Sequence, residues 1–186
     1  MRLFVAVNLP AAEHAALAAT LHGLRARDLP VRWVEPDSLH ITLKFLGEVA
    51  EARVGEVQAA LARAAQGISA FEMRVGGAGT FPSPNRARVF WIGVAAPAEL
   101  LRLQDQVENE IEPLGYAREK RAFSPHITIG RVQKDGRVAR TDVDRIVVGV
   151  GYNATMAVTS VDLMRSHLNP RGARYDTIAS APLENG

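Results

Sequence analysis

The sequence predicts an α+β fold in which two mostly antiparallel sheets, each backed by helices, face one another across a central cleft. Short β-prone runs alternate with helical patterns over the 186 residues. Several of these runs are joined by turns too short for a parallel crossover. The order strand, helix, strand occurs once in each half, so we expect a single bilobal domain over residues 1–186 with approximate repeats 1–80 and 86–180.

In the first half, periodicity and turn residues define a series of elements. They predict a strand at 3–7, a helix at 11–27, strands at 31–34 and 39–46, a helix at 51–65 and a strand at 71–75. The turn between the strands at 31–34 and 39–46 is short, so we expect a hairpin there. The glycines and prolines of 76–84 predict a loop that ends the first lobe.

The second half repeats this order and then adds a tail. The pattern predicts a strand at 88–94, a helix at 98–111, a strand at 124–131, a short helix around Val143, and strands at 155–164 and 174–178. A turn at Asn169–Gly172 separates the last two strands. They are therefore expected to form a closing hairpin.

Composition excludes several classes of protein. Hydrophobic residues make up 47% and charged residues 23%, as in ordinary globular proteins. Cysteine is absent, which rules out disulfides, thiolate metal sites and thiol nucleophiles. No apolar stretch reaches the roughly 20 residues of a membrane span, and residues 1–10 lead as a strand into the fold. We expect no signal peptide, no membrane anchor and a cytoplasmic location.

Arginine dominates the basic residues, with 19 arginines against three lysines. Guanidinium groups grip phosphate bidentately, but an Ala-rich and Arg-rich composition is also typical of GC-rich genomes. Genome composition is the simpler explanation for most of these arginines. Only those beside the motifs below count toward function.

Two His-x-Thr motifs carry the chemistry of the sequence. The first is His40 with Thr42, the second is His126 with Thr128, and each is followed by an aliphatic residue on a predicted strand. Side chains alternate along a strand, so the histidine and threonine of each motif share one face, about 6 to 7 Å apart. One such motif is more often structural than catalytic. Two copies at corresponding places of a repeated order favour a shared site.

A pair of histidines can perform acid–base chemistry on a phosphate. One neutral imidazole accepts a proton from the nucleophile, while a second, protonated one donates to the leaving oxygen. Threonine hydroxyls donate to non-bridging phosphate oxygens, and an arginine balances the charge on five-coordinate phosphorus. We therefore expect no metal and no other cofactor. The alternative, metal binding by His40 and His126, lacks the partner at i+3 to i+5 that such sites usually show.

At these motifs the sequence resembles the two-histidine (2H) phosphoesterase superfamily, and specifically the RNA 2',3'-cyclic phosphodiesterases, also described as 2'-5' RNA ligases. The resemblance spans nearly the whole chain. It includes residues 1–7, 31–34, the first motif with its Lys-Phe-Leu-Gly extension at 44–47, Phe81-Pro82, 89–93, the second motif, Arg165-Ser166 and Arg174-Tyr175.

The resemblance implies hydrolysis of a 2',3'-cyclic end to a 2'-phosphate and a free 3'-hydroxyl. His126 would be the base towards water and His40 the acid towards O3', with Thr42, Thr128 and Arg131 on the phosphate oxygens. The reverse reaction would join a 5'-hydroxyl in a 2'-5' linkage. The implied partners are RNAs with cyclic-phosphate ends, tRNA halves among them, and the protein is expected to act as a monomer without a membrane partner.

Strict strand alternation would send Arg131 away from His126 and Thr128. A bulge at Gly130 would return it to their face, and glycine inside a strand often marks a bulge. Without such a bulge, Arg131 would be a solvent-exposed arginine at the end of the strand, with no part in the site.

Two alternative functions stay open on the sequence. A non-catalytic module that binds RNA ends would fit the basic pI of about 9.3. A cyclic phosphodiesterase acting on small nucleotides would use the same residues, and a substrate assay separates it from an RNA enzyme.

Overall fold

The computed structural model describes residues 1–169 and 172–185, with four α-helices and nine β-strands among them. The helices are α1 (Ala11–Arg25), α2 (Val54–Ala65), α3 (Ala98–Ile111) and α4 (Arg140–Gly149). The strands are β1 (Arg2–Asn8), β2 (Val31–Trp33), β3 (His40–Glu48), β4 (Phe71–Phe81), β5 (Val89–Val94), β6 (His126–Val132), β7 (Asn153–Val158), β8 (Ser160–Asn169) and β9 (Gly172–Pro182).

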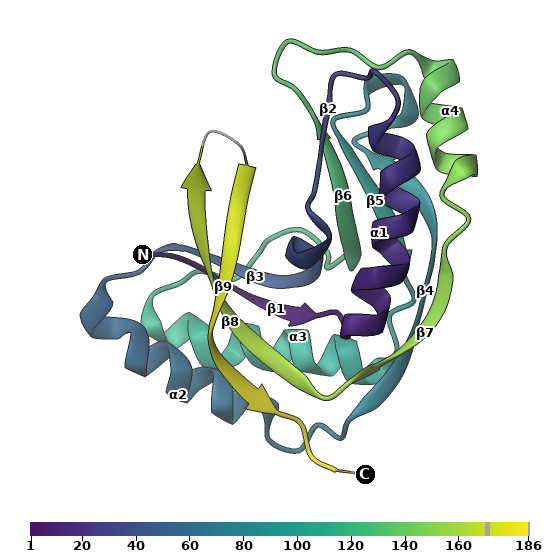
Figure 1. The fold of residues 1–186 in the computed structure, drawn as a ribbon. Helices are drawn as coiled ribbons and strands as arrows, with labels where there is room; N and C mark the ends of the chain where they lie inside the picture. Colours follow the sequence, from purple (N-terminus) through teal and green to yellow (C-terminus); the bar gives the residue numbers. More distant parts are fainter. Residues whose placement is uncertain (170–171, 186) are drawn as a thin grey trace.

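The strands form two antiparallel halves that meet at one place. The order is β7-β4-β5-β6-β3-β1-β8-β9, with β2 paired to β6. β3 and β6 pair only at Ile41 and Ile127 among the described residues. The α+β, two-lobed fold is therefore as expected, and its two sheets are joined into one curled sheet at a single contact (Figure 1).

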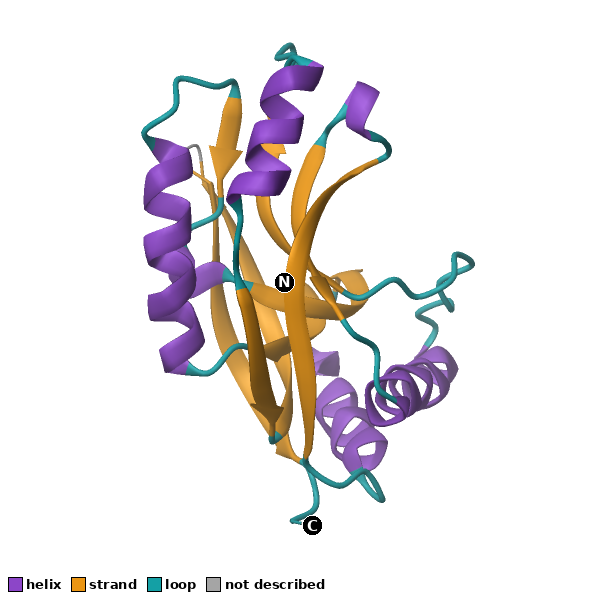
Figure 2. Cartoon of the chain, turned by 90° about the vertical axis from the view of Figure 1, so that its right-hand side faces the viewer, coloured by secondary structure: helices purple, strands orange, loops and turns teal. Residues whose placement is uncertain are grey.

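Helices cover one face of this sheet, which we call the helix face. α1 and α4 lie against the β7-β4-β5-β6 half, whereas α2 and α3 lie against the other half (Figures 1 and 2). Leucines at helical spacing on α1 and α3 supply the core, and Leu17, Leu21, Leu100 and Leu103 are all at most 1% exposed. Burying each contributes roughly 1.5 to 3 kcal/mol. No helix of the described chain is long and apolar enough to cross a membrane.

The opposite face, which we call the cleft face, has its own small cluster. Phe4 and Ala6 of β1 and Met164 of β8 are buried there, with Tyr175 of β9 packed against them. These strands alternate between two buried faces, so β1 is apolar almost throughout. This cluster supports the histidine of β3 described below.

Two sequence predictions in the first half are wrong. Strand β2 pairs with β6 rather than with β3, because a 3-10 turn at Pro36–Ser38 turns the chain away after β2. The expected loop at 76–84 is strand β4 as far as Phe81. Its glycines mark a bulge, where the register with β5 shifts between Val75 and Ala78 and Gly77 has a φ of 70°. β4 pairs with β5 on one side and with β7 on the other.

The predicted tail strand at 155–164 is two strands. β7 pairs with β4 in one half, and β8 pairs with β1 and β9 in the other. The chain crosses between the halves at Thr159, and no glycine or proline signals the break. The closing hairpin is confirmed by the pairing of β8 with β9. Part of its predicted turn, residues 170 and 171, lies outside the described residues.

Candidate active site

The pairing of β3 with β6 brings the two His-x-Thr motifs together. Ile41 opposes Ile127, and both side chains are fully buried on the helix face. Their neighbours therefore point to the cleft face, with one histidine opposite the threonine of the other strand. This register places the histidines diagonally, a relation in which residues lie roughly 7 to 8 Å apart and their Cβ atoms somewhat closer. The site residues His40, Thr42, His126 and Thr128 thus share one surface.

Both imidazoles are oriented by the same backbone contact. Nδ1 of His40 lies 2.8 Å from the carbonyl oxygen of Ser38, and Nδ1 of His126 lies 2.8 Å from that of Ser124. A carbonyl oxygen only accepts, so Nδ1–H donates in each ring and Nε2 is left for the cleft. Nε2 of His40 is 3.1 Å from Thr42 Oγ1. Each ring is therefore fixed through Nδ1, and Nε2 is the nitrogen left to contact a ligand.

His40 lies in the more apolar environment. Its ring is 4.9 Å from that of Phe4 and 5.0 Å from that of Tyr175. Burial lowers the pKa of His40 to about 4; the hydrogen bond to the Ser38 carbonyl opposes this shift, and the positive charges of Arg131 and His126 add to it. In the absence of a bound anion, His40 is therefore neutral at pH 7.

His126 lies beside a small hollow. Its ring meets Phe81 edge-on at 5.0 Å, and Phe81 in turn packs against Trp91. Both aromatic residues and Ser124 line a space of about 240 Å³ next to the imidazole. Trp91 Nε1 is buried there without a hydrogen-bond partner among the described residues. The second histidine therefore borders open space.

The predicted bulge near Gly130 is confirmed. Opposite β5 the register of β6 shifts between Phe90 and Trp91, so that Phe90 faces Gly130 and Trp91 faces Thr128. Ile129 is the extra residue, and alternation restarts after it. Arg131 is exposed and near enough to His40 to affect its pKa. The bulge thus brings Arg131 to the cleft face, as expected.

Strand β3 contains a matching irregularity without a glycine. Its first seven residues have the same alternation of buried and half-buried positions as the seven of β6. Phe45 takes the place that Arg131 has in β6, and its side chain is 69% exposed. Lys44 takes the place of Gly130 and is only 4% exposed. The two strands are therefore structurally equivalent but chemically different beyond the threonine.

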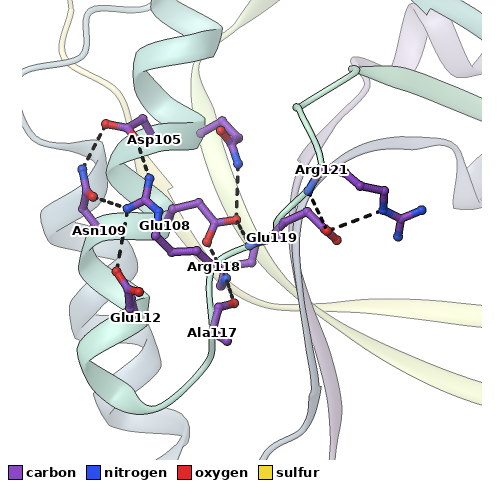
Figure 3. Close-up of polar contacts among 10 residues, drawn as sticks. Asp105, Glu108, Asn109, Glu112, Ala117, Arg118, Glu119 and Arg121 are labelled. Atoms are coloured by element: carbon purple, nitrogen blue, oxygen red, sulfur yellow. Dashed lines mark hydrogen bonds and ion pairs between the residues drawn. The ribbon is translucent and has the colours of Figure 1, made fainter.

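The buried Lys44 ties the loop before His126 to helix α3. Its Nζ donates to Glu108 Oε2 at 2.5 Å and to the carbonyl oxygen of Ala117 at 2.7 Å. The other oxygen of Glu108 accepts from the backbone N–H of Glu119 at 3.5 Å. Arg118 adds an exposed ion pair with Asp105 at 2.7 Å (Figure 3). This loop runs on to Ser124, whose carbonyl orients His126.

A second buried polar contact lies beside His40. Asn8 of β1 is directly opposite His40 in the pairing of β1 with β3. Its amide Nδ2 donates to Asp162 Oδ2 at 2.8 Å, and Asp162 is 5% exposed. Burying a carboxylate is costly unless it is hydrogen-bonded, so this contact fixes Asn8 in place. No motif in the sequence marks either residue as part of the site.

The two equivalent strands, β3 and β6, agree with a twofold match of the chain to a known family. The family model of the LigT-like phosphoesterases matches the chain twice, over residues 7–91 and 92–175. The chain belongs to the LigT-like phosphoesterase family. Each of the two matched ranges contains one of the His-x-Thr motifs.

Similar proteins extend over nearly the whole chain. An RNA 2',3'-cyclic phosphodiesterase of Archaeoglobus fulgidus is 37% identical, covering 94% of this chain and 96% of its own length. One from Methanothermobacter thermautotrophicus is 34% identical over 94% and 95%. A crystal structure of a Thermus thermophilus protein matches with a TM-score of 0.81 at 28% identity, over 100% and 99% of the two chains. E. coli LigT complexed with 3'-AMP matches with a TM-score of 0.76 at 28% identity, over 98% and 97%.

Proposed function

We propose that this protein hydrolyses the 2',3'-cyclic phosphate ends of RNA to a 2'-phosphate and a 3'-hydroxyl by two-histidine acid–base catalysis. As a member of a phosphoesterase family it is an enzyme. The diagonal placement of His40 and His126 on one face carries the proposal. A separation of roughly 7 to 8 Å between diagonal residues leaves room for one phosphorus between two Nε2 atoms.

In the proposed reaction, His126 takes a proton from water through Nε2 as the water oxygen attacks phosphorus. His40 gives the proton on its Nε2 to O3' as the P–O3' bond breaks, which leaves the phosphate on O2'. The hydrogen bonds of both Nδ1 atoms to backbone carbonyls support these roles, because they hold each ring with Nε2 toward the cleft. Exchange of the two roles gives the reverse reaction, 2'-5' ligation by a 5'-hydroxyl.

The acid role of His40 requires that it gain a proton when substrate binds. Its pKa of about 4 keeps it neutral in the ligand-free protein. A phosphodiester carries one negative charge, and an opposite charge within about 4 to 6 Å favours the protonated imidazole. Substrate binding thus raises the pKa of His40, so that this imidazole becomes a proton donor only when a phosphate is bound.

Thr42, Thr128 and Arg131 are proposed to hold the phosphate oxygens. The two hydroxyls lie on the same face as the histidines, and the bulge at Ile129 brings Arg131 there. Donors fixed before the reaction stabilise charge that develops on five-coordinate phosphorus. Their positions support binding of one phosphate between the strands.

The substrate class is supported by the names of the relatives, which are RNA 2',3'-cyclic phosphodiesterases. We propose cleaved RNAs, tRNA halves among them, as substrates, and a monomer that acts in the cytoplasm as a single bilobal domain. Metal independence is supported by the residues around the site: the described part of the chain has no group of three His, Asp or Glu side chains arranged for a metal.

The test is hydrolysis of a cyclic-phosphate oligonucleotide in excess EDTA, with analysis of the new end. We expect full activity and a 2'-phosphate. Loss of activity that a divalent ion restores would replace the scheme by a metal-activated water. A protein that binds the end without turnover would instead be the RNA-binding module, and turnover of cyclic mononucleotides alone would point to the small-nucleotide enzyme.

A further inference from the structure

Two arginines face one another beside the proposed active site, on strands that run side by side (Figure 1). Arg32 of β2 lies directly opposite Arg131 of β6 in the antiparallel pairing of these strands. Residues directly opposite in such a pair share one face of the sheet, with Cβ atoms about 4.5 to 5.5 Å apart. The two guanidinium groups therefore leave the sheet next to each other.

Both arginines project to the cleft face. Val31 and Val132, which adjoin them in the sequence, are 7% exposed and belong to the core of the helix face. Trp33, on the other side of Arg32, packs against the same core. Side chains alternate along a strand, so Arg32 and Arg131 point the opposite way, and both are exposed.

This pair of positive charges has no acidic partner. Like charges directly opposite one another destabilise a sheet. Glu35, the acidic residue nearest to Arg32 in the sequence, is paired with Arg25 of α1 at 3.1 Å. Within residues 1–169 and 172–185, neither Arg32 nor Arg131 forms an ion pair or a side-chain hydrogen bond. Two adjacent guanidinium groups without a carboxylate are suited to phosphate groups, which they bind bidentately.

The arginine pair lies on the His40 side of the site. The register of β3 with β6 places His40 opposite Thr128, and Arg131 lies beyond Thr128 in the direction away from His126. A rise of about 3.3 Å per residue puts Arg131 at most roughly 10 Å along β6 from Thr128. The charge of Arg131 reaches the His40 imidazole, where it lowers the pKa more than the charge of His126 does.

We infer that Arg32 binds the phosphodiester that joins the terminal nucleotide to its 5' neighbour. The inference rests on the proposed function and deepens it. In the proposed reaction His40 protonates O3', so the ribose lies on the His40 side of the phosphorus and the water on the His126 side. O2' and O3' of a cyclic end are both bonded to the reacting phosphorus, so the chain continues only through O5'. Arg131 contacts the reacting phosphate, and Arg32, opposite it, contacts the next phosphate along the chain.

The experiment compares a nucleoside 2',3'-cyclic phosphate with a dinucleotide that has the same cyclic end. The added nucleotide should lower KM in the unmodified protein. Arg32→Ala should raise KM for the dinucleotide about tenfold and Arg32→Glu should raise it more, since one charge-assisted hydrogen bond is lost. Both kcat and KM for the mononucleotide, which lacks the second phosphate, should change little.

A second dinucleotide identifies the group that Arg32 contacts. In it, an uncharged methylphosphonate replaces the linking phosphodiester. The unmodified protein should have a KM for it about tenfold higher than for the natural dinucleotide. Arg32→Ala should then cause little further loss, because both changes remove the same contact. Equal effects of Arg32→Ala on the two dinucleotides would overturn the inference.

The matched control is Arg74→Ala, which removes an exposed arginine of β4, a strand separated from β6 by β5. It should keep the low KM for the dinucleotide. Melting temperatures should show that Arg32→Ala is at least as stable as the unmodified protein, because the repulsion by Arg131 is relieved.

Three further outcomes would overturn the inference: no gain from the added nucleotide in the unmodified protein, a full gain in both Arg32 variants, or equal damage to both substrates in these variants. Failure of the unmodified protein to hydrolyse either substrate would overturn the proposed function as well. That failure is distinguished by occurring without any substitution.

Discussion

At the scale of single residues, histidine and threonine were predictable because their chemistry is carried by residue type and spacing. His40 and His126 are each followed by Ile-Thr in the sequence, and Nδ1 of each lies 2.8 Å from the backbone carbonyl oxygen two residues earlier. The residues around them were not predictable as site residues. Phe4 and Tyr175 reach His40 from strands far apart in the chain, and only the pairing of β1 with β8, and of β8 with β9, brings them there.

The threonines should matter less than the histidines. Thr42→Val or Thr128→Val removes one hydrogen bond to a charged phosphate, so kcat/KM should fall by roughly 10- to 150-fold, or about 1.5 to 3 kcal/mol. Steady-state kinetics on a cyclic-phosphate oligonucleotide measures this. Thr→Ser at the same positions keeps the hydroxyl and serves as the control. Equal losses in the Ser and Val variants would show that the hydroxyls do not hold the phosphate.

The ionisation of His40 can be followed directly by NMR. Its pKa should be about 4 in the free protein, because burial disfavours the imidazolium, and should rise when inorganic phosphate or a nucleoside 2'-phosphate binds. Activity that needs protonated His40 is lost as pH rises through its pKa, so the alkaline limb of the kcat/KM profile, which reports the free enzyme, should lie at lower pH than that of the kcat profile. His40→Gln assigns the resonance. A pKa of His40 that does not change when the anion binds would contradict the proposal that substrate binding protonates His40.

At the scale of elements, glycine correctly indicated the bulge in β6 but wrongly suggested a loop where strand β4 lies. Gly130 correctly indicated that β6 is irregular, whereas the equivalent place in β3 is filled by Lys44. The glycines of β4 suggested a loop, because the same residue type marks loops, bulges and close approaches. Only tertiary pairing decides among these, and here β5 and β7 hold β4 as a strand.

The ion pair between Lys44 and Glu108 should stabilise both the fold and the loop before His126. Lys44→Met leaves the carboxylate buried without its partner, so the free energy of unfolding should fall by roughly 3 to 5 kcal/mol. Adding Glu108→Leu should recover most of this loss. Urea denaturation measures both. Activity should stay low in the double variant, because Ala117 has then lost its donor.

The control for this pair lies on the same loop. Arg118→Ala breaks an exposed ion pair with Asp105 and should cost less than about 1 kcal/mol. If it destabilised the protein as much as Lys44→Met does, burial of the Lys44 pair would not explain the difference.

At the scale of the whole molecule, the repeated order of elements predicted the two lobes but not which strands form each half of the sheet. Each half of the sheet draws strands from both halves of the chain: β4 joins β5 and β7, and β8 joins β1. Local patterns specify which segments are strands, but not which partner a strand chooses when both faces are apolar. The single contact of β3 with β6 then sets the distance between the histidines.

A double-mutant cycle on the two histidines tests whether they act as one acid–base pair. Rates of hydrolysis of a cyclic-phosphate oligonucleotide are compared for the unmodified protein, His40→Ala, His126→Ala and the double variant. Each single substitution should lower kcat by about 10² to 10⁴-fold. The double variant should lose little more, because neither histidine completes the proton transfers alone. Near-normal kcat in either single variant, or fully additive losses in the double variant, would contradict a shared acid–base pair.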